Sequence, residues 1–113
     1  MENRNIKRFV HFSPDEVTRE TVFETEHLWS QVLCLSVNQK VGPLEDPGAD
    51  AMFLVVAGQG VFQVDTKRRR LDQWGTVLVP AGAAVTISNA TGDPLVLLLV
   101  AAPPPAARDV SGG

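Results

Sequence analysis

Apolar side chains recur at nearly every second position along most of this chain, in stretches that are short. A period of two places successive side chains on opposite faces of an extended strand. Glycine, proline, asparagine and aspartate separate the stretches, and these residues favour tight turns. Short strands with turns about every ten residues are typical of an all-β sandwich or barrel. The predicted strands are Ile6–Phe12, Thr21–Thr25, Ser30–Val37, Ala51–Val56, Gly60–Asp65, Arg69–Asp72, Thr76–Val79, Ala84–Ser88 and Leu95–Ala101.

One helical turn is predicted, at Ser13–Glu16. Ser13 can cap a helix, Pro14 suits its first position, and Glu16 completes a capping box. The β-branched residues that follow favour a strand, so we expect a single turn. The chain has 113 residues, enough for one domain. Within it we expect N-terminal strands and this turn over residues 1–29, packed on a barrel over residues 30–103, with a flexible C-terminal tail over residues 104–113.

Composition excludes several classes of function. Ten Lys and Arg against thirteen Asp and Glu give a net charge of −3, which argues against nucleic acid as a partner. The longest apolar run, Leu95 to Pro105, is too short to cross a bilayer. No apolar stretch follows the polar start of the chain, so we expect neither a signal peptide nor a membrane partner, and a cytoplasmic location. A single cysteine, Cys34, excludes an internal disulfide and a cysteine-rich zinc site.

Two predicted strands, Ala51–Val56 and Leu95–Ala101, are apolar on both faces. A strand of this kind is covered on both sides. Either a second copy of the chain covers the outer side, which makes a homodimer, or the N-terminal segment does.

Three segments resemble a known family. Phe53 to Gly60 resembles the F-x-V-L-x-G-x-G hairpin of the cupin superfamily. Gly75 to Asn89 resembles the second cupin motif, G-x5-P-x-G-x2-H-x3-N, with one residue fewer between Gly75 and Pro80. Pro47-Gly48-Ala49-Asp50 resembles part of the first motif in small single-domain cupins. The resemblance covers about residues 30 to 103 and implies a small cupin-type β-barrel of jelly-roll topology, often dimeric, with a central pocket.

Cupins usually hold a divalent metal with two His and a Glu from the first motif and a His from the second. With Pro47 to Asp50 as anchor, the resemblance puts these ligand positions on Leu44, Asp46, Ala51 and Val85. A second alignment of the first motif, with three residues between its second His and its Glu, moves the two His positions to Glu45 and Pro47. We prefer the first, because it also places Asn38 at the motif's opening glycine, where asparagine tolerates a left-handed backbone. At most one acidic ligand remains in either register, so we expect no metal and no cofactor.

A relocated site is an alternative. His27, Cys34 and Asp46 supply the donors for it, although Cys34 and His27 are seven residues apart and face opposite sides of one continuous strand. Otherwise Cys34 is a buried thiol, while His27 lies on the surface and His11 is solvated. Adjacent carboxylates at Glu45 and Asp46 offer a metal-free base, or are simply solvated.

The run Lys67-Arg68-Arg69-Arg70 is the one basic cluster. We interpret it as a charged edge strand that discourages aggregation, in preference to an anion clamp. The acidic residues of the N-terminal segment offer it partners. Trp29 and Trp74 are expected to be packing residues.

The predicted pocket is apolar, with one carboxylate at its mouth. Side chains fill it, or a small apolar ligand occupies it. We therefore expect a metal-free cupin-type barrel that acts as a small-molecule-binding or regulatory module, or as a structural one; the alternative is a small cupin enzyme, isomerase or dioxygenase-like, with a relocated metal or a metal-free acid–base site. The residues predicted to line the pocket are Leu44, Asp46, Ala51, Phe53, Val85, Ile87 and Cys34.

Overall fold

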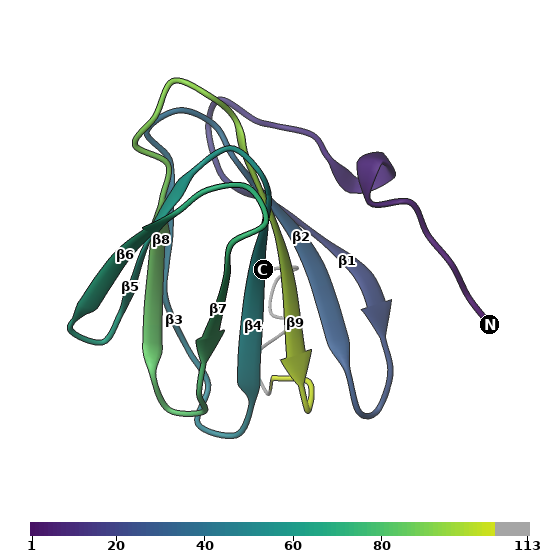
Figure 1. Cartoon of the computed structure of the whole chain (residues 1–113). Coiled ribbons are helices and arrows are strands. Elements are labelled where there is room, and N and C mark those ends of the chain that lie inside the picture. Colours follow the sequence, from purple (N-terminus) through teal and green to yellow (C-terminus); the bar gives the residue numbers. More distant parts are fainter. Residues whose placement is uncertain (106–113) are drawn as a thin grey trace.

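Within residues 1–105, nine strands form two antiparallel sheets that lie face to face (Figure 1). The computed structural model describes residues 1–105. The five-stranded sheet has the order β1 (Thr18–Glu24), β2 (Trp29–Leu35), β9 (Leu95–Ala102), β4 (Asp50–Ala57) and β7 (Thr76–Val79). The four-stranded sheet has the order β3 (Lys40–Glu45), β8 (Ala84–Ser88), β5 (Gly60–Val64) and β6 (Lys67–Leu71). The predicted all-β, jelly-roll architecture is confirmed.

The hydrophobic core lies between the sheets, because alternate residues of each strand point inward. Leu33, Val55 and Leu97 come from the five-stranded sheet and are fully buried. Phe62 and Ile87 meet them from the other sheet. The rings of Phe53 and Phe62 pack edge to face, with centroids 6.0 Å apart and an interplanar angle of 61°.

The predicted strand Ile6–Phe12 is wrong. Residues Ile6–Phe9 form a 3-10 helix, η1, and the Asn5 side chain caps it by accepting a hydrogen bond of 2.9 Å from the Lys7 backbone N–H. Ile6, Phe9 and Val10 are spaced by three and four residues, so a helical turn presents all three to the outer face of the five-stranded sheet. An extended strand would have turned Phe9 away from the other two.

The predicted helical turn at Ser13–Glu16 is also wrong, because this stretch forms bends only. The Ser13 hydroxyl accepts from the Asp15 backbone N–H at 3.1 Å, as a cap would. The Ser13 carbonyl, however, accepts from the Gln39 side chain at 2.8 Å and from the Ser36 hydroxyl at 3.3 Å. These long-range contacts tie the segment to the β2–β3 turn and leave no helical hydrogen bond to that carbonyl.

Strand β3 was not predicted, because Gly42-Pro43 resembles a turn. In the structure the pairing of β3 with β8 shifts register between Val41 and Leu44. Gly42 and Pro43, which lie between them, are therefore accommodated inside the strand as an irregularity. Gly42 has φ +111°, and a Cβ there would lie 2.5 Å from the Val85 carbonyl oxygen. Only glycine allows this approach.

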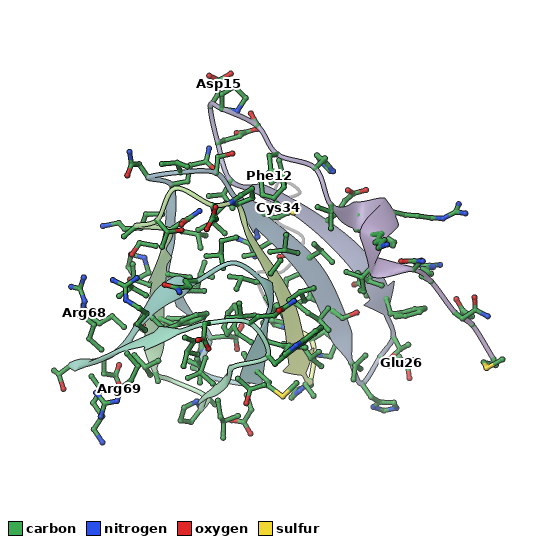
Figure 2. The ribbon with its side chains drawn as sticks, turned by 45° about the horizontal axis from the view of Figure 1, so that its top comes forward. Phe12, Asp15, Glu26, Cys34, Arg68 and Arg69 are labelled. Atoms are coloured by element: carbon green, nitrogen blue, oxygen red, sulfur yellow. The ribbon has the colours of Figure 1, made fainter. Side chains whose placement is uncertain are left out.

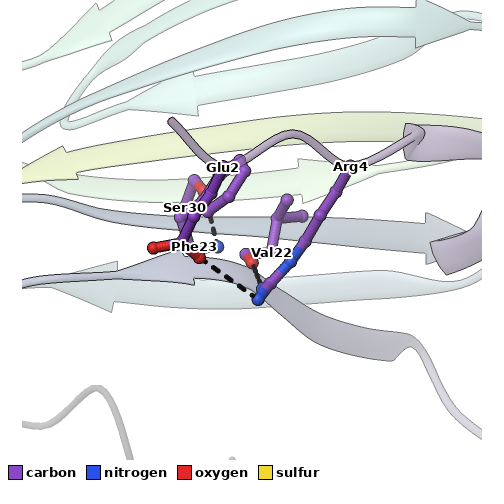
Figure 3. A network of polar contacts seen from close by, with 5 residues as sticks. All are labelled: Glu2, Arg4, Val22, Phe23 and Ser30. Atoms are coloured by element: carbon purple, nitrogen blue, oxygen red, sulfur yellow. Dashed lines mark hydrogen bonds and ion pairs between the residues drawn. The ribbon is translucent and has the colours of Figure 1, made fainter.

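The N-terminal segment covers part of the outer face of the five-stranded sheet. Ile6, Phe9 and Val10 pack against a buried cluster formed by Val22, Val32, Cys34 and Val96. Figure 3 shows how the first residues are held: the Arg4 guanidinium donates to the Val22 carbonyl and lies 4.9 Å from the centre of the Phe23 ring. Arg4 also pairs with Glu2 at 3.6 Å.

The other part of this outer face is open. Met52 and Leu78 are 41% and 64% exposed, and the neighbouring Leu54, Leu98 and Val100 are partly buried. Met52 pairs with both Val100 and Leu78 in the sheet, so these side chains lie together. We call Met52, Leu54, Leu78, Leu98 and Val100 the open apolar face.

The division into residues 1–29 and 30–103 stays a prediction, although β1 pairs directly with β2 inside one sheet. The tail expected over residues 104–113 lies outside the described residues except for Pro104 and Pro105. No helix within residues 1–105 is long and apolar enough to span a membrane.

Candidate binding pocket

A cavity of about 150 Å³ opens between the two sheets. Its wall includes residues of the β3–β4 turn, the β7–β8 turn, the start of β2 and the end of β9, which meet at the lower end of the barrel in Figure 1. Small residues make the space, since Ala49, Ala51, Ala83 and Ala101 all line it. Larger apolar side chains, Trp29, Phe53 and Leu99, complete the wall.

Hydrogen bonds between the two turns hold the mouth of this pocket. The Asp46 carbonyl accepts from the Gly82 N–H at 2.9 Å. The Asp50 carboxylate accepts from the Ala81 N–H at 2.8 Å. Within its own turn, the Asp46 carboxylate accepts from the Gly48 N–H at 2.8 Å. Three backbone N–H groups therefore fix the mouth by donating to one carbonyl and two carboxylates.

The structure brings five of the seven predicted pocket residues together. Leu44, Asp46, Ala51, Phe53 and Val85 line the cavity. Leu44 is the direct cross-strand partner of Val85, so both side chains point inward from β3 and β8. Ile87 is also inward but lies in the filled core and does not line the cavity.

Cys34 lies on the other side of the sheet, which corrects its predicted place in the pocket wall. Along β2 the side chains of Leu33 and Leu35 point to the core between the sheets, and Cys34, between them, packs in the outer cluster beneath the N-terminal segment (Figure 2). Burial raises the pKa of the Cys34 thiol, and hydrogen bonds with the His11 backbone and the Thr18 side chain oppose that rise. The thiol behaves as a small apolar residue.

The positions at which the family holds its metal do not fit one in this chain. The resemblance assigns them to Leu44, Asp46, Ala51 and Val85, and all four line this cavity. Leucine, alanine and valine carry no donor atom, so Asp46 is the single ligand that these positions provide. Glu45, from the alternative register, lines the cavity as well, but Pro47 does not.

The relocated site is not assembled either. Cys34 lies on the outer face, His27 is exposed in the turn between β1 and β2, and Asp46 lies at the cavity. Among residues 1–105 no three His, Cys, Asp or Glu side chains are grouped as a metal site would need. His11 is solvent-exposed, as predicted, and lies 3.2 Å from the Glu20 carboxylate.

Arg19 and Gln31 are the polar residues that the sequence did not reveal. Arg19 lines the cavity from β1, and its Nε donates a hydrogen bond of 2.8 Å to the Gln31 side-chain oxygen. Gln31 is only 4% exposed. Burial lowers the pKa of the Arg19 guanidinium. The predicted strand began at Thr21, whereas β1 begins at Thr18, and this boundary left Arg19 outside any strand.

The basic run and Trp74 lie elsewhere on the surface. Residues Lys67 to Leu71 form β6, at the edge of the four-stranded sheet, and its four basic side chains are all exposed. Arg68 and Arg69 point away from the barrel in Figure 2. Neither of the ion pairs found among residues 1–105 involves this run. Trp74 is 66% exposed, so its predicted packing role is wrong, whereas Trp29 is buried.

Comparison with known proteins gives structural relatives only, since no protein-family model and no curated protein matches the chain. TT1209 from Thermus thermophilus has a TM-score of 0.88 and 27% identity over 93% of this chain and 100% of its own. A Klebsiella pneumoniae protein with a double-stranded β-helix domain has a TM-score of 0.85 and 18% identity, over 91% of this chain and 90% of its own. An RmlC-like cupin from Desulfovibrio desulfuricans has a TM-score of 0.83 and 19% identity, over 92% of this chain and 98% of its own. The chain has the cupin fold.

The turns of this cupin barrel hold the residues that carry the resemblance. Asn38 has φ +67°, the left-handed conformation expected at the motif's opening glycine. Gly58 and Gly82 have φ +84° and +89°. Asn89, at the end of the second motif, is 1% exposed and is hydrogen-bonded through its side chain. The turns that carry the resemblance are therefore present in the structure.

Proposed function

We propose that this cupin barrel is a small-molecule-binding module whose ligand occupies the pocket between the sheets without a metal. The observation that supports this is the cavity itself. It lies where the family places its metal, and its lining at those positions is Leu44, Ala51 and Val85 with the single carboxylate of Asp46.

The size of the cavity favours a ligand over a completely filled barrel. Deeper in the core Phe53, Phe62 and Ile87 fill the space between the sheets. Nearer the mouth the alanines leave about 150 Å³. A cavity of about this size with apolar walls takes up a molecule the size of benzene.

A neutral apolar probe tests the binding proposal. In a titration with toluene followed by NMR, resonances of Ala51, Phe53 and Val85 are expected to shift saturably. Ala51→Leu is expected to abolish the shift, because the longer side chain fills the cavity. Ala102→Leu is the matched control, since Ala102 lies on the same sheet but is exposed and does not line the cavity. A chain that gives no saturable shift with toluene overturns the proposal.

Metal content tests the second half of the proposal. Protein purified without a chelator is expected to carry far less than one Fe, Mn, Ni or Zn per chain, because Asp46 alone cannot replace three imidazoles and a glutamate. Stoichiometric metal that is lost in Asp46→Ala, with the fold retained, contradicts it.

We further propose that the chain forms a homodimer through the open apolar face. The N-terminal segment covers the cluster around Val32 and Cys34 and leaves Met52 and Leu78 exposed. The five residues of the face are uncharged, so a second copy related by a two-fold axis brings apolar surfaces together.

Sedimentation velocity tests the dimer. The wild-type chain is expected to sediment as a dimer, and Leu78→Lys as a monomer. Val37→Lys is the control, because Val37 is exposed outside this face, after the end of β2. A monomeric wild type, or a Leu78→Lys variant that remains as dimeric as the control, refutes this interface.

A further inference from the structure

Arg19 is a cation within a mainly apolar cavity. It lies opposite Leu33 in the pairing of β1 with β2, and Leu33 belongs to the core between the sheets, so Arg19 points inward too. Neither of the ion pairs among residues 1–105 includes it. Glu20, the next residue of its strand, lies 3.2 Å from His11 instead. A partly buried charge that pairs with no carboxylate among the described residues is unfavourable unless something compensates it.

Gln31 orients the guanidinium. Its side-chain oxygen accepts from Arg19 Nε at 2.8 Å, and Gln31 is itself fixed by burial. This hydrogen bond uses the Nε edge, and no hydrogen bond from either Nη is found among the described residues. A guanidinium held in this way presents parallel N–H donors, whose spacing matches the two oxygens of a carboxylate.

The other charges of the cavity lie at its mouth. Glu45 is the exposed last residue of β3, and Asp46 follows it in the β3–β4 turn, where its carboxylate accepts from the Gly48 backbone N–H. Phe53 and Leu99 belong to the apolar part of the wall. The cavity thus combines a cation from β1 with acids from the end of β3 and the β3–β4 turn.

We infer that the ligand of this pocket is a small carboxylate with a compact apolar body, bound through its two oxygens to the Arg19 guanidinium. The body, about the size of one aromatic ring, lies among Trp29, Phe53 and Leu99. Burial lowers the pKa of the Arg19 guanidinium, which agrees with this, because burial disfavours an uncompensated positive charge. The inference rests on the proposed function and specifies the chemical class of its ligand.

Three probes of similar size and different charge test the inference: benzoate, benzyl alcohol and benzylamine. In calorimetric or NMR titrations benzoate is expected to bind roughly tenfold or more tightly than benzyl alcohol, because charge-assisted hydrogen bonds form only with the anion. Arg19→Met is expected to remove that preference, because it weakens binding of benzoate far more than binding of benzyl alcohol. Arg70→Met is the matched control, since Arg70 is exposed on β6.

A second variant covers the case in which Arg19→Met fails to fold. Gln31→Glu keeps the shape of the side chain and places a carboxylate beside Arg19 Nε. The added charge neutralises the guanidinium, so the preference for benzoate is expected to disappear here as well.

The outcomes separate the two proposals. Equal binding of benzoate and benzyl alcohol, or tighter binding of benzylamine, overturns the carboxylate inference while the binding function stands. If toluene and all three probes leave the resonances of Phe53 and Val85 unmoved, both proposals fail. A benzoate preference that survives both Arg19→Met and Gln31→Glu also overturns the inference, because another group then recognises the anion.

Discussion

The side-chain amide of Asn89 donates a hydrogen bond of 3.0 Å to the backbone carbonyl of Leu35, a residue 54 positions earlier in the chain. The same nitrogen donates to the Asp93 carbonyl at 2.7 Å, and the side-chain oxygen accepts from the Thr91 N–H at 3.1 Å. Asn89 thereby joins the turn that follows β8 to the end of β2, and with it the two sheets.

Asn89→Ala is therefore expected to lower the free energy of unfolding by about 2–4 kcal/mol, because it leaves buried backbone groups without partners. Urea unfolding followed by tryptophan fluorescence measures the change. Asn3→Ala is the control, since Asn3 is exposed. Similar midpoints for the two variants contradict the structural role of Asn89.

Two glycines provide a matched test of the turns. Gly58 has φ +84°, and a Cβ there would lie 2.2 Å from the Pro94 carbonyl oxygen. Gly58→Ala is expected to destabilise the fold by about 2–4 kcal/mol, through left-handed strain and steric overlap together. Gly92→Ala meets no atom within 4 Å and is expected to change stability little. Thermal unfolding measures the difference in stability between the two variants. Equal stability of both would mean that the β4–β5 turn rearranges to accept the side chain.

The thiol of Cys34 reports on the N-terminal segment. Phe9 packs on the cluster that contains Cys34, so Phe9→Ala is expected to speed labelling of the thiol by a disulfide reagent at neutral pH several-fold. Phe12→Ala is the control, because Phe12 is 37% exposed and is not part of that cluster. Equal labelling rates would mean that opening elsewhere in the sheet exposes the sulfur.

Cys34 also makes stability depend on pH. Burial raises its pKa in the folded chain, so above the ordinary pKa of a thiol the unfolded chain has lost a proton that the folded chain retains. Stability is then fully present below that ordinary value and falls as the pH rises above it. Denaturant unfolding from about pH 7 to about pH 10 is expected to show a larger loss for the wild type than for Cys34→Ala. Parallel profiles for the two chains would assign the loss to other groups.

The alternation of apolar residues was sufficient to predict most of the sheets, because alternate residues of β4, β8 and β9 are buried between the two sheets. It failed where local contacts compete with that pattern. Residues Ile6–Phe9 form a helical turn, because this conformation lets Ile6, Phe9 and Val10 all pack on the outer face of the sheet. Strand β3 contains Gly42 in a left-handed conformation, and its sequence shows no alternation of apolar residues from which the strand could be predicted.

The sequence was sufficient to predict those residues of the candidate site whose positions follow from the turns that resemble cupin motifs. It was not sufficient for residues whose positions depend on contacts between strands. Leu44, Asp46, Ala51 and Val85 line the cavity together because the turns fix their register. Arg19 and Gln31 were missed because their hydrogen bond joins two strands, and the predicted strand began after Arg19. Cys34 was misplaced because the direction of a side chain in β2 depends on which neighbours face the core.

The hydrogen bonds at the mouth of the pocket have a consequence for how such a barrel can change over time. The Gly82 and Ala81 N–H groups bind an Asp46 carbonyl and an Asp50 carboxylate, and the residues at positions 44, 51 and 85 take no part in those bonds. Substitution at those three positions alters what the cavity contacts and leaves its entrance in place. The architecture thus separates the shape of the entrance from the chemistry inside it, so point substitutions at these positions can change what the cavity contacts within one frame.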